Sequence, residues 1–341
     1  RIFRRFHGGY ACCSTISSRR SRRQLPIVAA RPCDLDARMP PPTRYDGRVA
    51  IVTGAGGGLG RKYAEFLASR GARVVVNDLN ENAAAAVVRA IEAAGGAALA
   101  NTDSVVDGEK IVAAAVGRWG RVDIVVSNAG VLRDTSYHKM SPKDFALVHS
   151  VHVGGAFAVT RAAWPHMREA RYGRIVLITS VNGLYGQFGQ ANYSSAKAAL
   201  VGFAKTLAAE GAGRNIKVNA LAPGAGTAMT ATIMPPELVA KWKQEYVVPC
   251  VAYLASEEVE ASGDVFEAGG GWMAQVRWQR SPGFFFDLSR EFGPEHVAEA
   301  WHKITEFGDD AVIVEDDRQA HDGLNGPQMR QIVQGPCPSK L

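Results

Sequence analysis

The sequence contains few cysteines, and their spacing offers no framework for disulfides or for zinc. Of the five cysteines, only Cys250 lies in the regularly patterned part of the chain, and no CxxC pair is present. Small secreted proteins that depend on disulfide bonds are therefore excluded, and a reducing compartment is expected.

The sequence also lacks a long apolar run, and its patterned part lacks an excess of positive charge. No apolar run approaches the roughly 20 residues that cross a bilayer, so membrane insertion is not expected. The net charge is +6, but residues 1–42 contain nine arginines and two aspartates and account for +7. The remaining residues therefore sum to −1, and nucleic acid is not an expected partner.

The two ends of the chain differ in composition from its middle. Residues 1–42 are rich in Arg, Ser and Pro without a hydrophobic period, as in an unstructured leader. Two interpretations stay open: translated leader sequence before Met39, which we favour, or an organelle transit peptide. Residues 311–341 are predicted to form an extended tail that ends in Ser339-Lys340-Leu341, a signal read by the peroxisomal import receptor. We expect a peroxisomal protein, with the mitochondrion as the alternative.

Between these ends, in residues 43–310, short β-branched runs alternate with segments of helical spacing. The predicted strands are 48–54, 73–78, 98–101, 122–130, 174–180, 216–224 and 264–270, and the predicted helices are 61–71, 83–94, 107–118, 141–167 and 192–209. The strands are apolar on both faces, as a parallel sheet covered by helices requires. We predict one α/β domain with a doubly wound, Rossmann-like parallel sheet and helices on both faces.

The segment TGAGGGLG, residues 53–60, lies between the first predicted strand and its helix. Gly54 would make the tight turn, Gly58 would let a pyrophosphate approach the backbone, and Gly60 would let the helix pack closely. The free N–H groups of the helix start attract phosphates. This context predicts a dinucleotide site.

Asp78 ends the second predicted strand, about 20 residues after the glycine turn. A carboxylate there accepts hydrogen bonds from the 2′-hydroxyl of an adenosine ribose and repels a 2′-phosphate. The expected cofactor is therefore NAD rather than NADP, although Arg61 and Lys62 at the helix start could weaken that preference.

Tyr193 and Lys197 lie four residues apart on a predicted helix and so share one face, while Ser180 ends the strand before it. Moving a hydride to or from a carbonyl carbon requires moving a proton at its oxygen. A nearby ammonium would lower the ordinary tyrosine pKa near 10 and make Tyr193 a usable base. Ser180 would hold the substrate oxygen while charge develops there.

These motifs together resemble the short-chain dehydrogenase/reductase family. The resemblance rests on TGAGGGLG, on SNAG at 127–130, on Ser180 and on YSSAK at 193–197, and it spans roughly residues 44–270. The catalytic residues that it implies are Ser180, Tyr193 and Lys197. The cofactor contacts that it implies are Gly54, Gly58, Leu59, Gly60, Asp78, Asp103, Ser104, Val105, Asn128, Tyr193, Lys197, Ala225, Gly226 and Thr227.

A longer stretch, about residues 44–307, is similar to the dehydrogenase part of the peroxisomal multifunctional enzymes of type 2. It includes LYGQFGQANYSSAK, FEAGGGWMAQVRWQR and EHVAEAWHKI. This narrower resemblance implies a homodimer that uses NAD to oxidise (3R)-3-hydroxyacyl-CoA to 3-ketoacyl-CoA in peroxisomal fatty-acid β-oxidation. Two alternatives are a short-chain enzyme acting on a steroid or a 3-oxoacyl carrier-protein thioester, and a non-catalytic dinucleotide-binding protein.

Two histidines stand out within the predicted helix 141–167. His152 occupies the place where the family at large has an asparagine that serves a proton relay. His149 lies three residues earlier, but no third ligand accompanies the pair, so no metal site is expected.

Overall fold

The computed structural model describes residues 41–226 and 236–314. Most of the predicted basic leader, Thr227 and the C-terminal Ser339-Lys340-Leu341 lie outside this part of the chain. Within the described residues, no helix is both long enough and apolar enough to span a bilayer.

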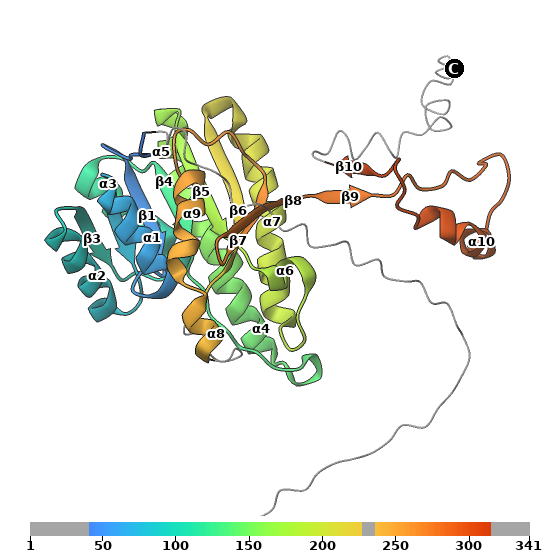
Figure 1. Cartoon of the computed structure of the whole chain (residues 1–341), viewed down its shortest axis with the longest axis horizontal. Coiled ribbons are helices and arrows are strands. Elements are labelled where there is room, and N and C mark those ends of the chain that lie inside the picture. The colour runs from blue at the N-terminus through green and yellow to red at the C-terminus, as the bar shows by residue number, and fades with distance from the viewer. Residues whose placement is uncertain (1–40, 227–235, 315–341) are drawn as a thin grey trace, which may run out of the picture. The chain divides into compact units, whose positions relative to one another are not determined.

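The described residues form one large sheet of eight strands in the order β3-β2-β1-β4-β5-β6-β7-β8 (Figure 1). The strands are β1 (Val49–Thr53), β2 (Arg73–Asn77), β3 (Ala97–Asn101), β4 (Ile124–Ser127), β5 (Gly173–Ile178), β6 (Ile216–Gly224), β7 (Val265–Gly269) and β8 (Trp272–Val276). All neighbours are parallel except β7 and β8. Strand order reverses between β1 and β4, where such sheets open a ligand crevice at their carboxyl ends.

Helices cover both faces of this sheet (Figure 1). They are α1 (Gly58–Ser69), α2 (Glu81–Ala93), α3 (Gly108–Trp119), α4 (Pro142–His149), α5 (Gly155–Ala170), α6 (Val181–Tyr185), α7 (Ala191–Gly211), α8 (Pro236–Lys241) and α9 (Val248–Leu254). One buried cluster joins the sheet to α1, α2 and α9, and a second joins it to α3, α5 and α7. The doubly wound parallel sheet predicted from the strand pattern is confirmed.

The long predicted helix 141–167 differs from the structure in its middle. A π-helical turn, Ser150–Gly154, separates α4 from α5 and contains His152. A π turn adds a residue to the helical period and is often found at functional sites. The 3.6-residue pattern of the flanking segments gives no sign of this insertion, so sequence periodicity alone did not locate it.

The C-terminal part of the fold also holds strands that sequence patterning did not locate. β8 follows β7 through Gly270 and Gly271, both at positive φ, and pairs with it in the antiparallel sense. Farther along, β9 (Trp278–Arg280) pairs with β10 (Val312–Val314), and α10 (Pro294–Ile304) lies between them in the chain. The predicted tail from residue 311 therefore begins with a short strand.

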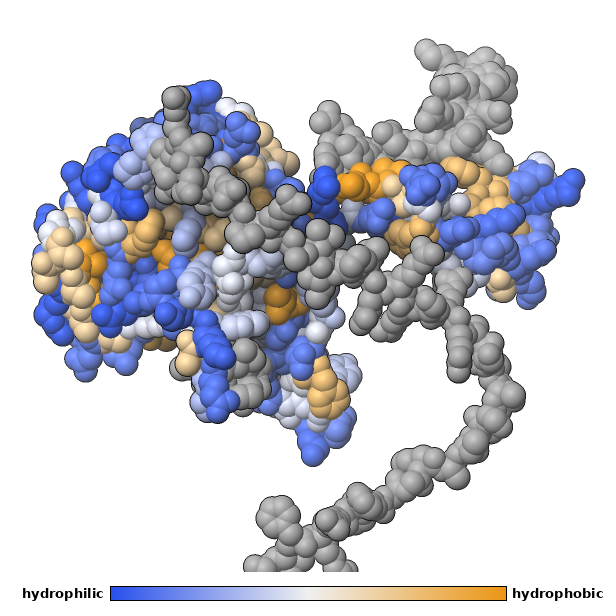
Figure 2. Space-filling model, in the orientation of Figure 1, coloured by the Kyte–Doolittle hydropathy of each residue, from blue (hydrophilic) through white to orange (hydrophobic). Residues whose placement is uncertain are grey.

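Several large apolar side chains of this C-terminal segment are open to solvent (Figure 2). Trp278, Phe285 and Trp301 are all more than half exposed. Monomeric soluble proteins rarely leave a group of large apolar side chains uncovered.

Close packing between α3 and α5 depends on Gly108. A methyl group at this position would lie 2.2 Å from the backbone carbon of Ala158 on α5. We expect Gly108→Ala to lower the free energy of unfolding by about 1–3 kcal/mol, because two helix backbones would have to separate. Chemical denaturation followed by circular dichroism measures the change.

Gly117, on the exposed side of the same helix, is the matched control. A methyl group there would meet no atom within 4 Å. Gly117→Ala should raise the free energy of unfolding by roughly 0.5–1 kcal/mol, because alanine favours the helix. Equal effects of the two substitutions would contradict the packing role of Gly108.

Candidate active site

The turn between β1 and α1 requires glycine for two different reasons. Gly54 and Gly58 have φ values of +61° and +54°, a region that side chains with a Cβ rarely adopt. Gly60 has no such backbone, but a methyl group there would lie 2.2 Å from the Gly54 carbonyl oxygen. Gly60 therefore lets α1 begin directly against the turn, as predicted from its spacing.

Asn128 holds this turn to the end of β4. Its side-chain amide donates to the carbonyl oxygens of Thr53 (2.9 Å) and Gly54 (3.1 Å). In return, the Thr53 hydroxyl oxygen accepts from the backbone amides of Asn128 (3.0 Å) and Ala129 (3.1 Å). The two strands at the topological switch are thereby joined just where a ligand crevice is expected.

Asp78 lies directly beside the glycine turn. Its carboxylate accepts one hydrogen bond from the amide of Gly56 and another from the amide of Asn80, each at 2.9 Å. A methyl group on Gly56 would lie 2.8 Å from this carboxylate. Gly56 is thus a further required glycine, which the spacing of Gly54, Gly58 and Gly60 did not reveal.

The remaining predicted cofactor contacts follow strand ends of the same sheet. Asp103, Ser104 and Val105 follow β3 after one intervening residue, and Ala225 and Gly226 come directly after β6. Leu59 is half-buried and packs against the buried cluster that joins the sheet to α1, α2 and α9.

Ser180, Tyr193 and Lys197 converge at the carboxyl end of β5. Ser180 caps the start of α6, where its hydroxyl oxygen accepts from the amide of Asn182 at 3.1 Å. The same hydroxyl lies close enough to the Tyr193 phenol to favour the phenolate and act to lower its pKa. The Lys197 ammonium nitrogen lies 5.7 Å from the centre of the Tyr193 ring. The three predicted catalytic side chains are therefore neighbours.

Close contact between α6 and α7 makes this convergence possible. A methyl group on Gly183 would lie 2.6 Å from Cβ of Lys197. The Thr179 hydroxyl donates to the Lys197 carbonyl oxygen at 2.6 Å and ties α7 to the end of β5. Gly183 was not singled out from the sequence, because it lies outside any motif with known spacing.

The pKa of Tyr193 is raised, whereas the sequence led us to expect a lowered value. The side chain is 8% exposed, and burial opposes formation of the phenolate more strongly than anything nearby favours it. The hydrogen bond from Ser180 lowers the pKa, and the Asp134 carboxylate raises it further. The expected direction was wrong because burial of the phenol could not be read from its spacing to Lys197.

Lys197 is buried, and its ammonium group donates to the carbonyl oxygen of Ile178 at 2.5 Å. Burial lowers the pKa of this lysine to about 7. A charge held in such an environment interacts strongly with its neighbours because water screens it poorly.

His152 packs edge-on against the Tyr193 ring, with 5.2 Å between the ring centres. Its Nε2 lies 3.1 Å from the amide nitrogen of Val131 and 2.9 Å from that residue's carbonyl oxygen. Burial, and then the Lys197 charge, lowers the pKa of His152 to about 3, so the imidazole is neutral. A methyl group on Gly130 would lie 2.3 Å from this ring, so Gly130 leaves the space that His152 fills.

His149 has different neighbours from His152. Its Nε2 lies 2.9 Å from the Ser195 hydroxyl, and its ring stacks on Phe145. Among the described residues, no three His, Cys, Asp or Glu side chains are grouped to hold a metal.

A chain of polar side chains that motif spacing did not reveal links the serine turn to the loop after β4. Asn182 donates to the side-chain oxygen of Gln190 at 2.7 Å, and Gln190 donates to the Asp134 carboxylate at 2.6 Å. Gln190 is 5% exposed, and its side-chain amide makes hydrogen bonds on both sides. Replacing it would leave its buried partners without those bonds, which is costly. These hydrogen bonds hold the side chains of Asn182, Gln190 and Asp134 in fixed positions near Ser180.

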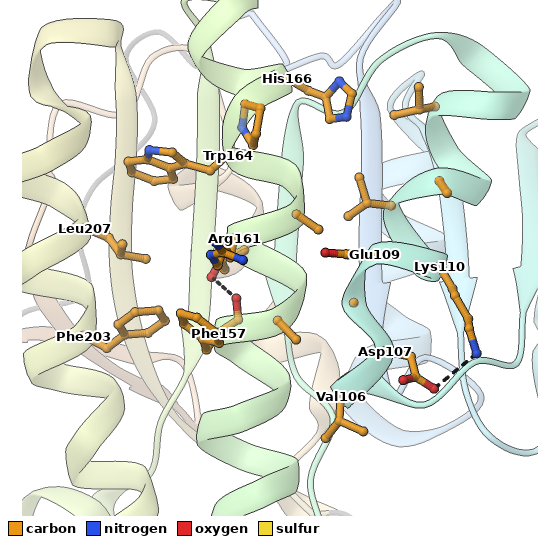
Figure 3. A pocket seen from close by; sticks show the side chains of 18 of the residues that line it. Val106, Asp107, Glu109, Lys110, Phe157, Arg161, Trp164, His166, Phe203 and Leu207 are labelled. Atoms are coloured by element: carbon orange, nitrogen blue, oxygen red, sulfur yellow. Dashed lines mark hydrogen bonds and ion pairs between the residues drawn. The ribbon is translucent and has the colours of Figure 1, made fainter.

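A cavity of about 1150 Å³ lies elsewhere, along α3, α5 and α7 (Figure 3). Its apolar lining includes Phe157, Trp164, Phe203 and Leu207, and charged side chains such as Arg161 surround them. None of its lining residues belongs to the predicted catalytic or cofactor set.

Comparison with known proteins relates this chain to one enzyme family. The profile of the short chain dehydrogenase family matches residues 48–237. The peroxisomal multifunctional enzyme type 2 of Mus musculus is 48% identical over 279 residues, which are 79% of this chain and 38% of that protein. The chain therefore spans well under half the length of this curated relative.

Two solved structures share the fold. The full-length peroxisomal multifunctional enzyme type 2 of Drosophila melanogaster has a TM-score of 0.74 and 40% identity, over 84% of this chain and 50% of that one. A 7α-hydroxysteroid dehydrogenase in complex with NADH has a TM-score of 0.63 and 30% identity, over 67% of this chain and 95% of that one. With a family profile matching more than half of its residues and these relatives, the chain belongs to the short-chain dehydrogenase family.

Proposed function

We propose that this chain uses NAD to oxidise (3R)-3-hydroxyacyl-CoA to 3-ketoacyl-CoA in peroxisomal fatty-acid β-oxidation. The convergence of Ser180, Tyr193 and Lys197 at the end of β5, in the sheet whose strand β1 ends at the glycine turn, carries the oxidoreductase part of this proposal. The similarity to peroxisomal multifunctional enzymes supports an acyl-CoA substrate. It also supports location in the peroxisome rather than in the mitochondrion.

The glycine turn fits a dinucleotide. Methyl groups at Gly57 and Gly58 would meet no protein atom within 4 Å, which leaves room for phosphates at the start of α1. Asp78, whose carboxylate accepts from the Gly56 amide, would accept from a ribose 2′-hydroxyl and repel a 2′-phosphate, which supports NAD. When bound, NAD supplies a hydride acceptor for the substrate carbon.

The protein's own side chains handle the proton at the substrate oxygen. Ser180 donates a hydrogen bond to that oxygen, and Tyr193, once in its phenolate form, accepts the proton and becomes the phenol. Burial alone disfavours the phenolate, so the positive charge of Lys197 has to offset part of this cost while the proton moves. His152 supports the face of Tyr193 as an uncharged ring and adds no competing positive charge.

The protein would act as a homodimer, and we place the contact on α5 and α7. The cavity along these helices has an apolar centre, with Glu109, Lys110, Arg161 and Glu210 among its charged lining residues. A surface that carries both signs of charge around an apolar centre can match a copy of itself across a twofold axis.

A substrate panel tests the proposed reaction. The full chain should reduce NAD with (3R)-3-hydroxyacyl-CoA thioesters, at higher kcat/KM than with the 3S isomers or with hydroxysteroids, and with lower KM for NAD than for NADP. Absorbance of the reduced cofactor reports the rate. Preference for the 3S isomer would contradict the proposed substrate, and preference for a steroid would favour the alternative short-chain activity.

Tyr193→Phe is the control variant for this panel. It removes the proton acceptor but keeps the ring that packs against His152. We expect kcat to fall by about 10²–10⁴ while the dissociation constant of NAD changes little. Unchanged turnover would exclude Tyr193 as the base.

The buried lysine predicts a pH dependence of stability. Because burial lowers the pKa of Lys197 from 10.5 to about 7, the unfolded chain binds more protons between these pH values. The wild-type protein therefore gains stability as pH rises through this window, and Lys197→Met does not. The free energy of unfolding of the wild-type protein, relative to that of Lys197→Met, should rise by on the order of 1–3 kcal/mol between about pH 6.5 and about pH 9.5.

Chemical denaturation at each pH measures this difference. Lys205→Met is the matched control, because it removes a half-buried lysine from the same helix α7. A change with pH as large in Lys205→Met as in Lys197→Met would contradict the assignment to Lys197.

The dimer contact can be tested at Phe157, which is 51% exposed on α5. We expect Phe157→Lys to convert the protein to a monomer in sedimentation velocity, because it places like charges at a twofold contact. Tyr253→Lys on α9 changes an equally exposed aromatic on the other face of the sheet and should leave the dimer intact. A wild-type monomer would refute the homodimer itself.

A further inference from the structure

The strands β2 and β3 both end on an asparagine with a buried side chain. Asn77 and Asn101 are direct partners in the parallel register and are 1% and 8% exposed. The strand positions before Asn77 are valines, so the amide groups interrupt an apolar layer. Burying an amide is costly unless its hydrogen bonds are made, so the neighbours of this pair matter.

Several side-chain hydrogen bonds of the pair converge on Asp103. The Asn77 amide donates to the Asn101 side-chain oxygen and to the Asp103 carbonyl oxygen, both at 2.8 Å. The Asn101 amide donates to Oδ2 of Asp103 at 2.7 Å, and the Asn101 side-chain oxygen accepts from the Asp103 amide at 3.2 Å. The backbone and one carboxylate oxygen of Asp103 are therefore fixed together.

The same pair is connected to Asp78. The backbone amide of Asp78 donates to the Asn101 carbonyl oxygen at 3.0 Å. The carbonyl oxygen of Asn77 accepts from the amide of Ala55 in the glycine turn at 2.9 Å. Asn77 and Asn101 thus join the turn, the proposed ribose contact Asp78 and the loop that carries Asp103.

The family resemblance implies that Asp103 lies near the adenine of the cofactor. We propose that Asn101, held by Asn77, is a positioning residue that orients the Asp103 carboxylate toward the 6-amino group of that base. The Asn101 amide donates a hydrogen bond to Oδ2 of Asp103, and Oδ1 is left to accept a hydrogen bond from the base. A fixed acceptor at this place favours adenine, which carries a donor at carbon 6, over hypoxanthine, which carries an acceptor there. This inference rests on the proposed binding of NAD.

The test compares the dissociation constants of NAD and nicotinamide hypoxanthine dinucleotide, measured by calorimetry on the full chain. The wild-type protein should bind NAD at least about tenfold more tightly, because one charge-assisted hydrogen bond distinguishes the two. Asn101→Asp replaces the donor by an acceptor facing the Asp103 carboxylate, and the ratio should fall toward one.

A reciprocal exchange separates positioning from general damage. Adding Asp103→Asn to Asn101→Asp restores the hydrogen bond in the opposite direction and keeps a carbonyl oxygen for adenine, so most of the selectivity should return. Asn219→Asp is the matched control. Asn219 is also fully buried, and it braces the loop before β7 through Ala261 and Asp264. It should lower stability without changing the NAD-to-hypoxanthine ratio.

Three outcomes would overturn the inference. An unchanged ratio in Asn101→Asp, or an equal fall in Asn219→Asp, would mean that Asn101 does not position the adenine contact. A wild-type protein that binds both dinucleotides equally would show that Asp103 does not read adenine at all. Binding of neither dinucleotide would instead reject the proposed function together with this inference. If Asn101→Asp does not fold, Asn101→Ala serves in the same comparison.

Discussion

The hydrogen bond from the buried Lys197 ammonium to the Ile178 carbonyl is the constraint on which the candidate site depends. It attaches the N-terminal part of α7 to the last residue of β5, and the bond from Thr179 to the Lys197 backbone reinforces it. With α7 held there, Tyr193, one turn earlier, lies beside Ser180 at the strand end. The same burial that makes the attachment rigid also makes the ammonium costly to keep charged.

Burial therefore acts on three side chains of the site at once. It raises the pKa of Tyr193 and lowers those of Lys197 and His152, so every one of the three is biased toward its neutral form. Tyr193 and His152 are thereby held neutral at physiological pH, whereas Lys197, with a pKa of about 7, can gain or lose its charge there.

Sequence patterning located most of the sheet and the motifs, for identifiable reasons. Parallel strands buried on both faces leave continuous apolar runs, and the glycine turn has fixed spacing, so Gly54 and Gly60 could be assigned before the fold was known. The spacing of Tyr193 and Lys197 placed them on one helix face, but their pKa directions depend on burial, which spacing does not encode. Contacts between distant segments, such as Gly56 with Asp78 and Asn77 with Asn101, also required the fold.

The antiparallel strand β8 has a consequence for how copies of this chain can associate. Because β8 satisfies the outer backbone groups of β7, the parallel part of the sheet presents no open edge on that side. Two copies therefore cannot merge their sheets through β7, and the edge strands of the described sheet are β3 and β8. An open strand edge can pair with any extended chain and lead toward aggregation, and β8 closes that route at β7.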